Sequence, residues 1–338
     1  LEPQRLQLIQ YSEDFSQGYW TKSSSSVVSG FVSPDGSLNA DKLVEDTSNG
    51  EHFVRTSNSN TLNNSYTYSI MVKPSGRNYL RIREATLTGA GADFDLLNKT
   101  TTVVQGNSSN LITTTATITE LVNGFFRISF TYKPNATGNY NFTISLSDAL
   151  GNISYTGDGT SGVYIYGAQV EQGSFPTSYI PNYGTSAGIT RSAETANGAG
   201  DASTFNDSEG VLMVEGSFVD DTSYKGISIS NGTNSNSIRI YASVSDNQLV
   251  FRVTVNSVDQ VLQLYTLNNT SIYNKISIKY RENDFNVFIN GFKLLTDNSG
   301  STFSSGILNQ LNFNRSDGND PFYGSTKQIQ YFDSALND

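Results

Sequence analysis

The sequence predicts an all-β protein made of two antiparallel β-sandwich (jelly-roll) domains in tandem. Apolar and polar residues alternate with a period of two, as in strands that bury one face and expose the other. Gly, Pro, Asn and Asp turn signals separate these runs. The length of 338 residues is long for one sandwich and sufficient for two. No convincing helical periodicity or heptad pattern interrupts the runs.

The first half of the chain contains five clear alternating runs. In each run the apolar side chains fall on one face and hydroxyl, amide or charged side chains fall on the other. We therefore expect half-buried strands separated by turns such as Pro74–Gly76 and Gly157–Gly159. The expected strands are Tyr66–Val72, Tyr79–Arg83, Phe126–Tyr132, Phe142–Leu146 and Val163–Ile165.

The pattern resumes in the second half with a further set of strands. The clearest hairpin spans Phe285–Leu295, where Asn290-Gly291 favours a tight type I′ turn. The other expected strands are Val211–Phe218, Ile227–Ser230, Ile238–Val244, Leu249–Val255, Val261–Leu264, Lys275–Tyr280 and Thr326–Phe332.

A stretch rich in glycine and small residues separates the two sets of strands. Alternation stops between about Tyr183 and Asp207, which favours a linker or a loose terminal strand. We therefore expect one domain over residues 1–190, a linker over 191–206 and a second domain over 207–338.

The composition narrows the possible partners. Only 15% of residues are charged and the net charge is −10, so the chain should repel nucleic-acid phosphates and anionic membranes. The absence of cysteine excludes disulfides, thiol catalysis and Cys-ligated metals. No apolar run approaches a membrane span. The chain begins at Leu1 and has the character of a piece of a longer protein.

The first domain resembles the carbohydrate-binding-module-like β-sandwiches of bacteriophage virion proteins and some secreted bacterial proteins. Phe125 and Tyr166 stand where that family often has tryptophan, which indicates that these rings serve the core. Leu6-Gln7 replaces the commoner Thr-Asn. The matching segments occur in the family's order: Leu1–Arg5, Tyr11–Ser16, Tyr19–Lys22, Ser33–Gly36, Asn39–Asp46, Asn123–Arg127, and Gly167–Gly173 within Tyr155–Pro181.

The second domain resembles a concanavalin A-like or laminin G-like sandwich from the same viral setting. Both kinds of module commonly bind glycans or make virion contacts, so the resemblance implies these roles. The matching segments are Ser208–Glu215, Tyr273–Tyr280, Asn290–Gly291, Pro321–Gly324 and Gln328–Asp338.

Catalytic constellations are not evident, and we predict a non-enzymatic protein. His52 is the only histidine and lies in a polar stretch, which favours neither a Ser-His-Asp arrangement nor a zinc site. Several acids are close in sequence, but none follows the Glu-x-Asp-x-x-Glu pattern of sandwich-fold glycanases, so we interpret them as solvated loop acids. These groups are Glu13/Asp14, Asp41/Glu45/Asp46, Asp93/Asp95 and Asp220/Asp221.

Binding of structural calcium is a better interpretation of some of these acids than catalysis. Hard oxygen ligands on loops can fasten a sandwich through Ca²⁺, although no EF-hand spacing is present. The candidate metal ligands are Glu13, Asp14, Asp41 and Asp46.

Glycan binding calls for an aromatic plane beside hydrogen-bonding or charged side chains on one exposed face. In the first domain, Tyr79, Arg81 and Arg83 share a face opposite Leu80 and Ile82, and their arginines suit a carboxylated or sulfated glycan. In the second domain, Arg239 and Tyr241 share a face around the inward Ile240. The alternatives are an ordinary solvated strand and an oligomer contact. Other groups expected on loops or exposed faces there are Tyr224, Lys225, Arg252, Arg315 and Asp317.

These observations favour a non-catalytic segment of a phage tail or head fibre or spike, exposed on the virion surface or outside the cell. Its expected partners are a polysaccharide or cell-surface glycan and other virion proteins, with homo-oligomerisation plausible. One alternative is a pair of accessory carbohydrate-binding modules of a secreted polysaccharide-degrading enzyme. Another is a purely structural virion decoration, and a hidden lyase or hydrolase has the least support.

Overall fold

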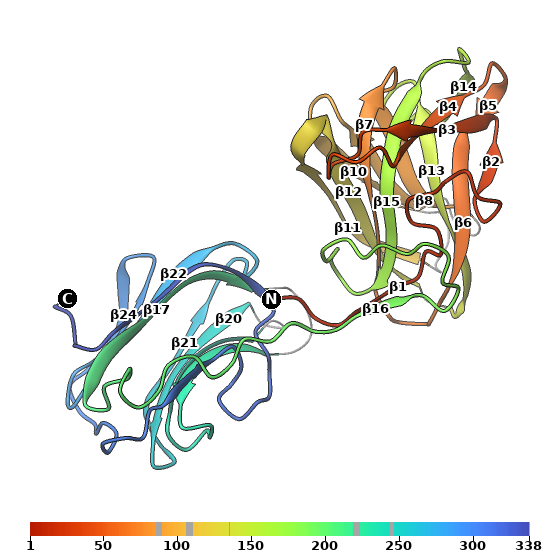
Figure 1. Ribbon diagram of the computed structural model, residues 1–338. Helices are drawn as coiled ribbons and strands as arrows, with labels where there is room; N and C mark the ends of the chain where they lie inside the picture. The colour runs from red at the N-terminus through yellow and green to blue at the C-terminus, as the bar shows by residue number, and fades with distance from the viewer. Residues whose placement is uncertain (86–89, 106–110, 135, 219–223, 244–246, 338) are drawn as a thin grey trace. The chain divides into compact units, whose positions relative to one another are not determined.

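The computed structural model describes residues 1–338 apart from 86–89, 106–110, 135, 219–223, 244–246 and 338. The chain divides into two compact units, Gln4–Ser192 and Leu1–Pro3 with Ala193–Asp338. Each unit is a β-sandwich (Figure 1), and all the ladders between named strands are antiparallel in the described residues. This confirms the predicted fold class. In the described residues the helical structure is one 3₁₀ turn, Val122–Gly124, and no helix there could span a bilayer.

The N-terminal unit contains two six-stranded sheets, ordered β10-β9-β8-β13-β6-β2 and β11-β12-β7-β15-β4-β3. The strands are β1 (Arg5–Gln7), β2 (Thr21–Ser23), β3 (Ser25–Phe31), β4 (Ala40–Glu45), β5 (Asn49–Glu51), β6 (Phe53–Asn60), β7 (Tyr66–Ser75), β8 (Tyr79–Glu84), β9 (Gly91–Asp95), β10 (Thr100–Val104), β11 (Leu111–Glu120), β12 (Phe126–Pro134), β13 (Gly138–Ser147), β14 (Ser154–Thr156), β15 (Gly162–Gln172) and β16 (Ile189–Arg191). Two small sheets, β1-β16 and β14-β5, complete the unit.

The core of this sandwich is built by the alternating residues of the two facing sheets. Tyr68 of β7 contacts Phe142 of β13 with ring centroids 4.6 Å apart, so the two sheets meet there. The only tryptophan, Trp20, is buried in the same core and donates its ring N–H to the carbonyl of Tyr11. Phe125 and Tyr166 are buried in a smaller apolar cluster, in keeping with a packing role.

The C-terminal unit contains two five-stranded sheets, ordered β24-β23-β22-β17-β26 and β21-β20-β19-β18-β25. The strands are β17 (Glu209–Phe218), β18 (Lys225–Ser230), β19 (Ser237–Ser243), β20 (Gln248–Val255), β21 (Val258–Thr266), β22 (Asn274–Arg281), β23 (Phe285–Ile289), β24 (Phe292–Asp297), β25 (Gln310–Asn312) and β26 (Gly324–Phe332). At the β23–β24 turn, Asn290 and Gly291 both have positive φ, as a type I′ turn requires.

The unit boundaries differ from the expected domains in two places. Residues from Ala193 onward, expected to begin a linker, group with the C-terminal sandwich: Ala199 pairs with Leu311, and the N–H of Phe313 donates to the carbonyl of Ala196. Leu1–Pro3 also belongs to that unit, and Leu1 exchanges backbone hydrogen bonds with Gly324. Glycine-rich composition indicated a loose segment but did not reveal these backbone partners.

Candidate functional site

A hollow lies on the C-terminal sandwich, over the face of β19 and β20 that points away from the core. It has a volume of about 370 Å³. The inward residues of these strands, including Ile238, Ile240 and Phe251, fill the core, so the intervening side chains face outward. We call this hollow the arginine trough; its lining is Asn234, Ser235, Arg239, Tyr241, Arg252, Thr254, Ser257 and Arg315.

Strand register brings the main polar groups together. Arg239 of β19 stands opposite Arg252 of β20, and Ser237 stands opposite Thr254 in the same ladder. Ser257 sits at the tight β20–β21 turn with φ +67°, where its N–H donates to the carbonyl of Ser235. The trough is therefore assembled from two paired strands and the loops at their ends.

Two of the three arginines have carboxylate partners. Arg252 makes a two-pronged contact with Asp259, with Nε–Oδ1 at 2.8 Å and Nη2–Oδ2 at 2.7 Å. Arg315 lies 2.9 Å from Asp320 and 3.4 Å from Asp317. None of these carboxylates lines the trough.

Arg239 differs from both. Only 3% of it is exposed, and its hydrogen-bond acceptors are neutral: Oδ1 of Asn234 at 3.0 Å and Oγ1 of Thr254 at 2.8 Å. Its Nε–H has no acceptor in the part of the chain that the structure describes. A buried charge without a direct counter-charge is costly and is common at functional sites.

The electrostatic surroundings agree with this difference. Burial lowers the pKa of Arg239, and the positive charge of Arg252 lowers it further. The hydrogen bond from Arg252 to Asp259 instead raises the pKa of Arg252. Burial raises the pKa of Asp259, but hydrogen bonds from Arg252 and Thr254 outweigh burial and hold that pKa below its ordinary value. Asp259 is thus ionised and hydrogen-bonded to Arg252 and Thr254, while the hydrogen-bond acceptors of Arg239 are neutral.

The structure gathers the predicted second-domain residues Arg239 and Tyr241 into this trough. Asn234, Thr254 and Ser257 were not among the predicted site residues. Thr254 had a detectable signal, because it alternates with the inward Val253 and shares a face with Arg252. The loop residues Asn234 and Ser257 had no such signal in the sequence. Lys225, expected on a loop or exposed face, is fully buried, with its amine 5.5 Å from the ring centre of Tyr323.

The predicted first-domain patch lies on β8, with Tyr79, Arg81 and Arg83 on one face as alternation predicts. Arg81 forms a two-pronged pair with Asp93 at 2.7 and 2.8 Å, and Arg83 pairs with Glu51. Because both guanidinium groups already contact carboxylates, this patch has less capacity for an anionic ligand than the trough.

The predicted metal ligands are engaged separately. Glu13 accepts hydrogen bonds from the hydroxyls of Tyr166, Tyr179 and Tyr183 and from the amide of Asn39. The described residues contain no group of three or more His, Cys, Asp or Glu side chains placed to hold a metal. Asp14 binds Ser16 and Gln17, Asp41 accepts the N–H of Phe15, and Asp46 accepts from Ser48.

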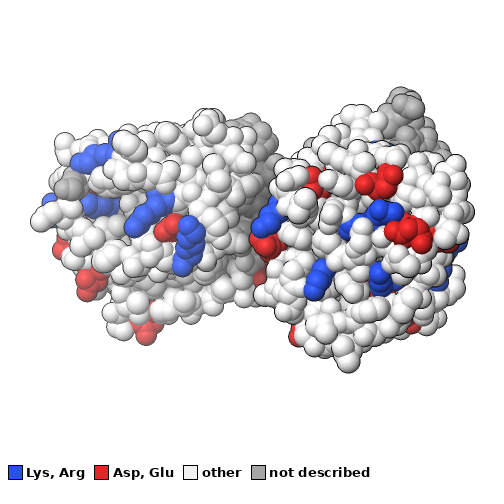
Figure 2. Space-filling view, turned by 90° about the horizontal axis from the view of Figure 1, so that it is seen from above, with Lys and Arg blue, Asp and Glu red and all other residues white. Residues whose placement is uncertain are grey.

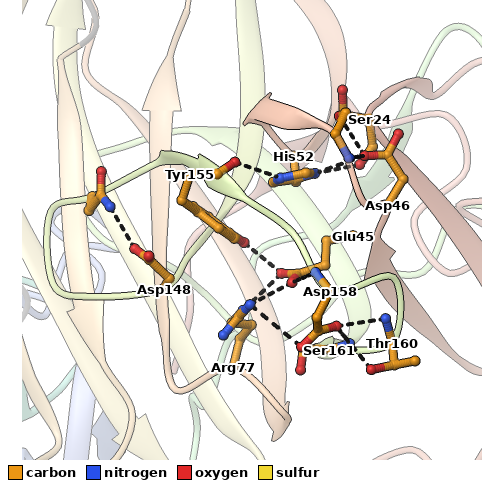
Figure 3. Close-up of polar contacts among 12 residues, drawn as sticks. Ser24, Glu45, Asp46, His52, Arg77, Asp148, Tyr155, Asp158, Thr160 and Ser161 are labelled. Carbon is orange, nitrogen blue, oxygen red and sulfur yellow. Dashed lines mark hydrogen bonds and ion pairs between the residues drawn. The ribbon is translucent and has the colours of Figure 1, made fainter.

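The acids and histidine considered for catalysis lie mainly in contacts that fasten loops. Figure 3 shows Glu45 accepting from Arg77, Tyr155 and the N–H of Asp158. His52 is fully buried; its Nδ1 lies 2.6 Å from the carbonyl of Ser24 and 3.5 Å from Asp46. Asp220 and Asp221 lie outside the described residues.

Comparison with known proteins identifies no family. No family profile matches the chain, and no curated protein matches it. Sheep galectin-11 in complex with glycerol is 9% identical, with a TM-score of 0.27, covering 36% of this chain and 89% of that one. Chicken galectin 2 is 13% identical, with a TM-score of 0.28, covering 40% and 99%. Domains LG4-5 of the mouse laminin alpha1 chain are 10% identical, with a TM-score of 0.29, covering 84% and 90%. Likenesses this distant support no conclusion about function.

Proposed function

We propose that this chain is a non-catalytic binding segment that attaches to polysaccharide through its C-terminal sandwich. The arginine trough carries the proposal: a hollow on the sheet face that points away from the core, lined by amide, hydroxyl and guanidinium groups beside the ring of Tyr241. Sugars present hydroxyls that such groups can satisfy and apolar ring faces that an aromatic side chain can cover.

The surrounding surface suits recognition through a few placed groups. Figure 2 shows a face made mostly of uncharged residues, with basic and acidic side chains often next to each other. The net charge of −10 opposes general adhesion to polyanions, so an anionic polymer would need a local contact of opposite sign.

The proposed setting is the surface of a virion or the extracellular space, as part of a phage tail or head fibre or spike. The support is the order and number of sequence segments that resemble virion sandwiches. Weak individual sites would gain avidity from display in many copies, through a homo-oligomer or other virion proteins. Calcium bound through loop acids such as Glu13 remains part of the proposal and would act as a structural clamp.

Binding to a polysaccharide panel tests the function. The full chain is displayed on beads in many copies, with calcium or with chelator, and compared with Tyr241→Ala. We expect Tyr241→Ala to weaken binding several-fold, because a ring contact with a sugar is lost. Tyr265→Ala is the matched control, since Tyr265 is partly exposed on the edge strand β21 outside the trough.

Other outcomes select the alternatives. Binding that survives Tyr241→Ala would keep polysaccharide attachment and reject the trough as its site. Absence of binding in multivalent form would favour the decoration role. Release of reducing ends from a bound polymer would contradict the non-catalytic assignment. A polysaccharide-degrading domain in the same reading frame would favour an accessory module of a secreted enzyme.

A further inference from the structure

The lining of the arginine trough carries three positive charges and no negative one. Arg239, Arg252 and Arg315 line it, whereas the carboxylates that neutralise Arg252 and Arg315 do not. Arg239 makes no ion pair with any described residue and is almost completely buried. A hydrophobic side chain in its place would avoid the cost of burying this charge, so the fold alone gives little reason for an arginine here.

Several polar atoms in and beside the trough lack partners. The Nε–H groups of Arg239 and Arg315 have no acceptor within the described residues. Ser228 of β18 stands opposite Arg239 in the same ladder, and its buried Oγ also has no partner there. Water could satisfy these hydrogen bonds, but it would not supply a direct counter-charge to Arg239. The negative charge of Asp259 acts on Arg239 without an ion pair, because Asp259 contacts Arg252 and Thr254.

We propose that the arginine trough binds the oxyanion of an acidic sugar, a carboxylate or a sulfate ester, with Arg239 as its principal contact. Arg315, which is paired with Asp317 and Asp320, lines the same trough from the neighbouring loop and plays at most a secondary part. Asn234 and Thr254 hold Arg239 in place. Guanidinium groups suit such oxyanions because their planar set of donors makes directed, charge-assisted hydrogen bonds. The inference rests on the proposed function and specifies the class of glycan.

Polymer pairs that differ only in charge test the inference. The full chain is titrated with polygalacturonate against its methyl ester, and with heparin against fully desulfated, N-acetylated heparin. Dextran is the neutral reference. We expect at least one acidic polymer to bind roughly tenfold or more tightly than its matched partner, the size of one charge-assisted hydrogen bond. The two pairs separate a carboxylate preference from a sulfate preference.

Substitutions locate the contact. Arg239→Gln should lose most of the preference for the acidic polymer, whereas Arg239→Lys should retain part of it because the charge remains. Arg315→Gln tests the same trough at a side chain that is 32% exposed, where folding is less at risk. Arg281→Gln is the matched control, because Arg281 pairs with Asp284 on the exposed surface of the same unit and does not line the trough.

Each result has a distinct meaning. Equal affinity for the two members of each pair would overturn the oxyanion assignment while polysaccharide attachment stands. Absence of binding to every polymer in multivalent form would contradict both. An equal loss with Arg281→Gln and Arg315→Gln would show general charge attraction and overturn the trough as the site. Unchanged binding of the acidic polymer by correctly folded Arg239→Gln would also overturn the trough as the site.

Discussion

At the scale of single residues, Arg239 is the group least explained by folding. Arg81 and Arg83 also point away from the core of their sandwich, yet each contacts a carboxylate, and Arg239 does not. Its two acceptors have other partners: Asn234 Oδ1 also accepts from Ser316, and Thr254 Oγ1 donates to Asp259. Removing the guanidinium therefore leaves neither of these groups unsatisfied.

This arrangement predicts that Arg239→Met leaves the stability of the C-terminal unit unchanged or raises it. The substitution removes a buried charge and keeps much of the side-chain volume, a change that is often neutral or stabilising. Thermal unfolding followed by circular dichroism measures the effect. We also expect the Arg239→Met protein to lose binding to the acidic polymer when binding is measured on the same sample. A clear loss of stability would contradict the prediction and show that Arg239 has a structural role.

Glu45, by contrast, is a buried carboxylate with a direct counter-charge. Its four hydrogen bonds join β4 to Tyr155 of β14 and to the segments that hold Arg77 and Asp158. We expect Glu45→Gln to destabilise the N-terminal unit by about 3 kcal/mol, because the guanidinium of Arg77 loses its main counter-charge. Urea unfolding followed by tryptophan fluorescence isolates this unit, since Trp20 is the only tryptophan and lies in its core. Glu120→Gln, at an exposed pair with Lys99, should change stability little.

The same group predicts a pH dependence. Burial raises the pKa of Glu45, but hydrogen bonds from Arg77, Tyr155 and Asp158 outweigh it and hold the pKa below the ordinary 4.5. A lowered folded-state pKa contributes stability above about pH 4.5, and that stability is lost as the pH falls through the folded-state value. Wild-type stability should therefore decline below pH 4.5, and Glu45→Gln should decline less steeply. Parallel declines would contradict this role.

At the scale of elements, alternation located many of the long strands, although β6 and β11 were not among the expected ones. β7, β8, β12, β13 and the hairpin β23–β24 appear where the apolar period predicts them, because each buries one face. Short strands such as β5, β14 and β25 have three residues each and too few side chains to show a period. The arginines and tyrosine of the trough were visible as outward residues, but its loop residues depend on tertiary contacts that no local pattern encodes.

Gly162, at the start of β15, shows how closely strands approach. A Cβ at this position would lie 1.8 Å from the carbonyl oxygen of Leu43 on β4, which is a backbone atom. We expect Gly162→Ala to destabilise the N-terminal unit by about 2 kcal/mol through overpacking. Gly138→Ala, at the start of β13, has open space around the new methyl group and is the control. Equal effects of the two substitutions on urea unfolding would contradict the close approach.

At the scale of the whole molecule, the chain passes between the two units twice, after Pro3 and after Ser192. The N-terminal sandwich is thus inserted between Leu1–Pro3 and the remainder of the C-terminal unit. The residues on either side of these two crossings are hydrogen-bonded to each other. In the N-terminal unit β1 pairs with β16, and in the C-terminal unit Glu2 bonds to Glu194. Sequence analysis did not reveal this arrangement because three residues carry no pattern of their own.

Deletion of residues 1–3 should therefore destabilise the C-terminal unit and leave the N-terminal unit little changed. The deletion removes the hydrogen bonds that Leu1 exchanges with the backbone of Gly324. It also removes those from Glu2 N–H to the carboxylate of Glu194 and from Glu194 N–H to the carbonyl of Glu2, and the set is together worth about 2 kcal/mol. Circular dichroism should show an earlier transition, while Trp20 fluorescence should follow the unchanged unit. A shift in the fluorescence transition alone would contradict the division of the chain into these units.

The central claim is that Arg239 meets an acidic sugar, and its side-chain N–H can be observed directly. The measurement is ¹H–¹⁵N NMR of the arginine Nε–H groups in the full chain, assigned by substitution, during titration with an oligogalacturonate and with a heparin oligosaccharide. We predict that the Arg239 resonance shifts saturably with at least one ligand, while those of Arg77 and Arg81, paired with Glu45 and Asp93, stay in place. Saturable binding with an unmoved Arg239 resonance would contradict the claim, as would the absence of any shift with either ligand.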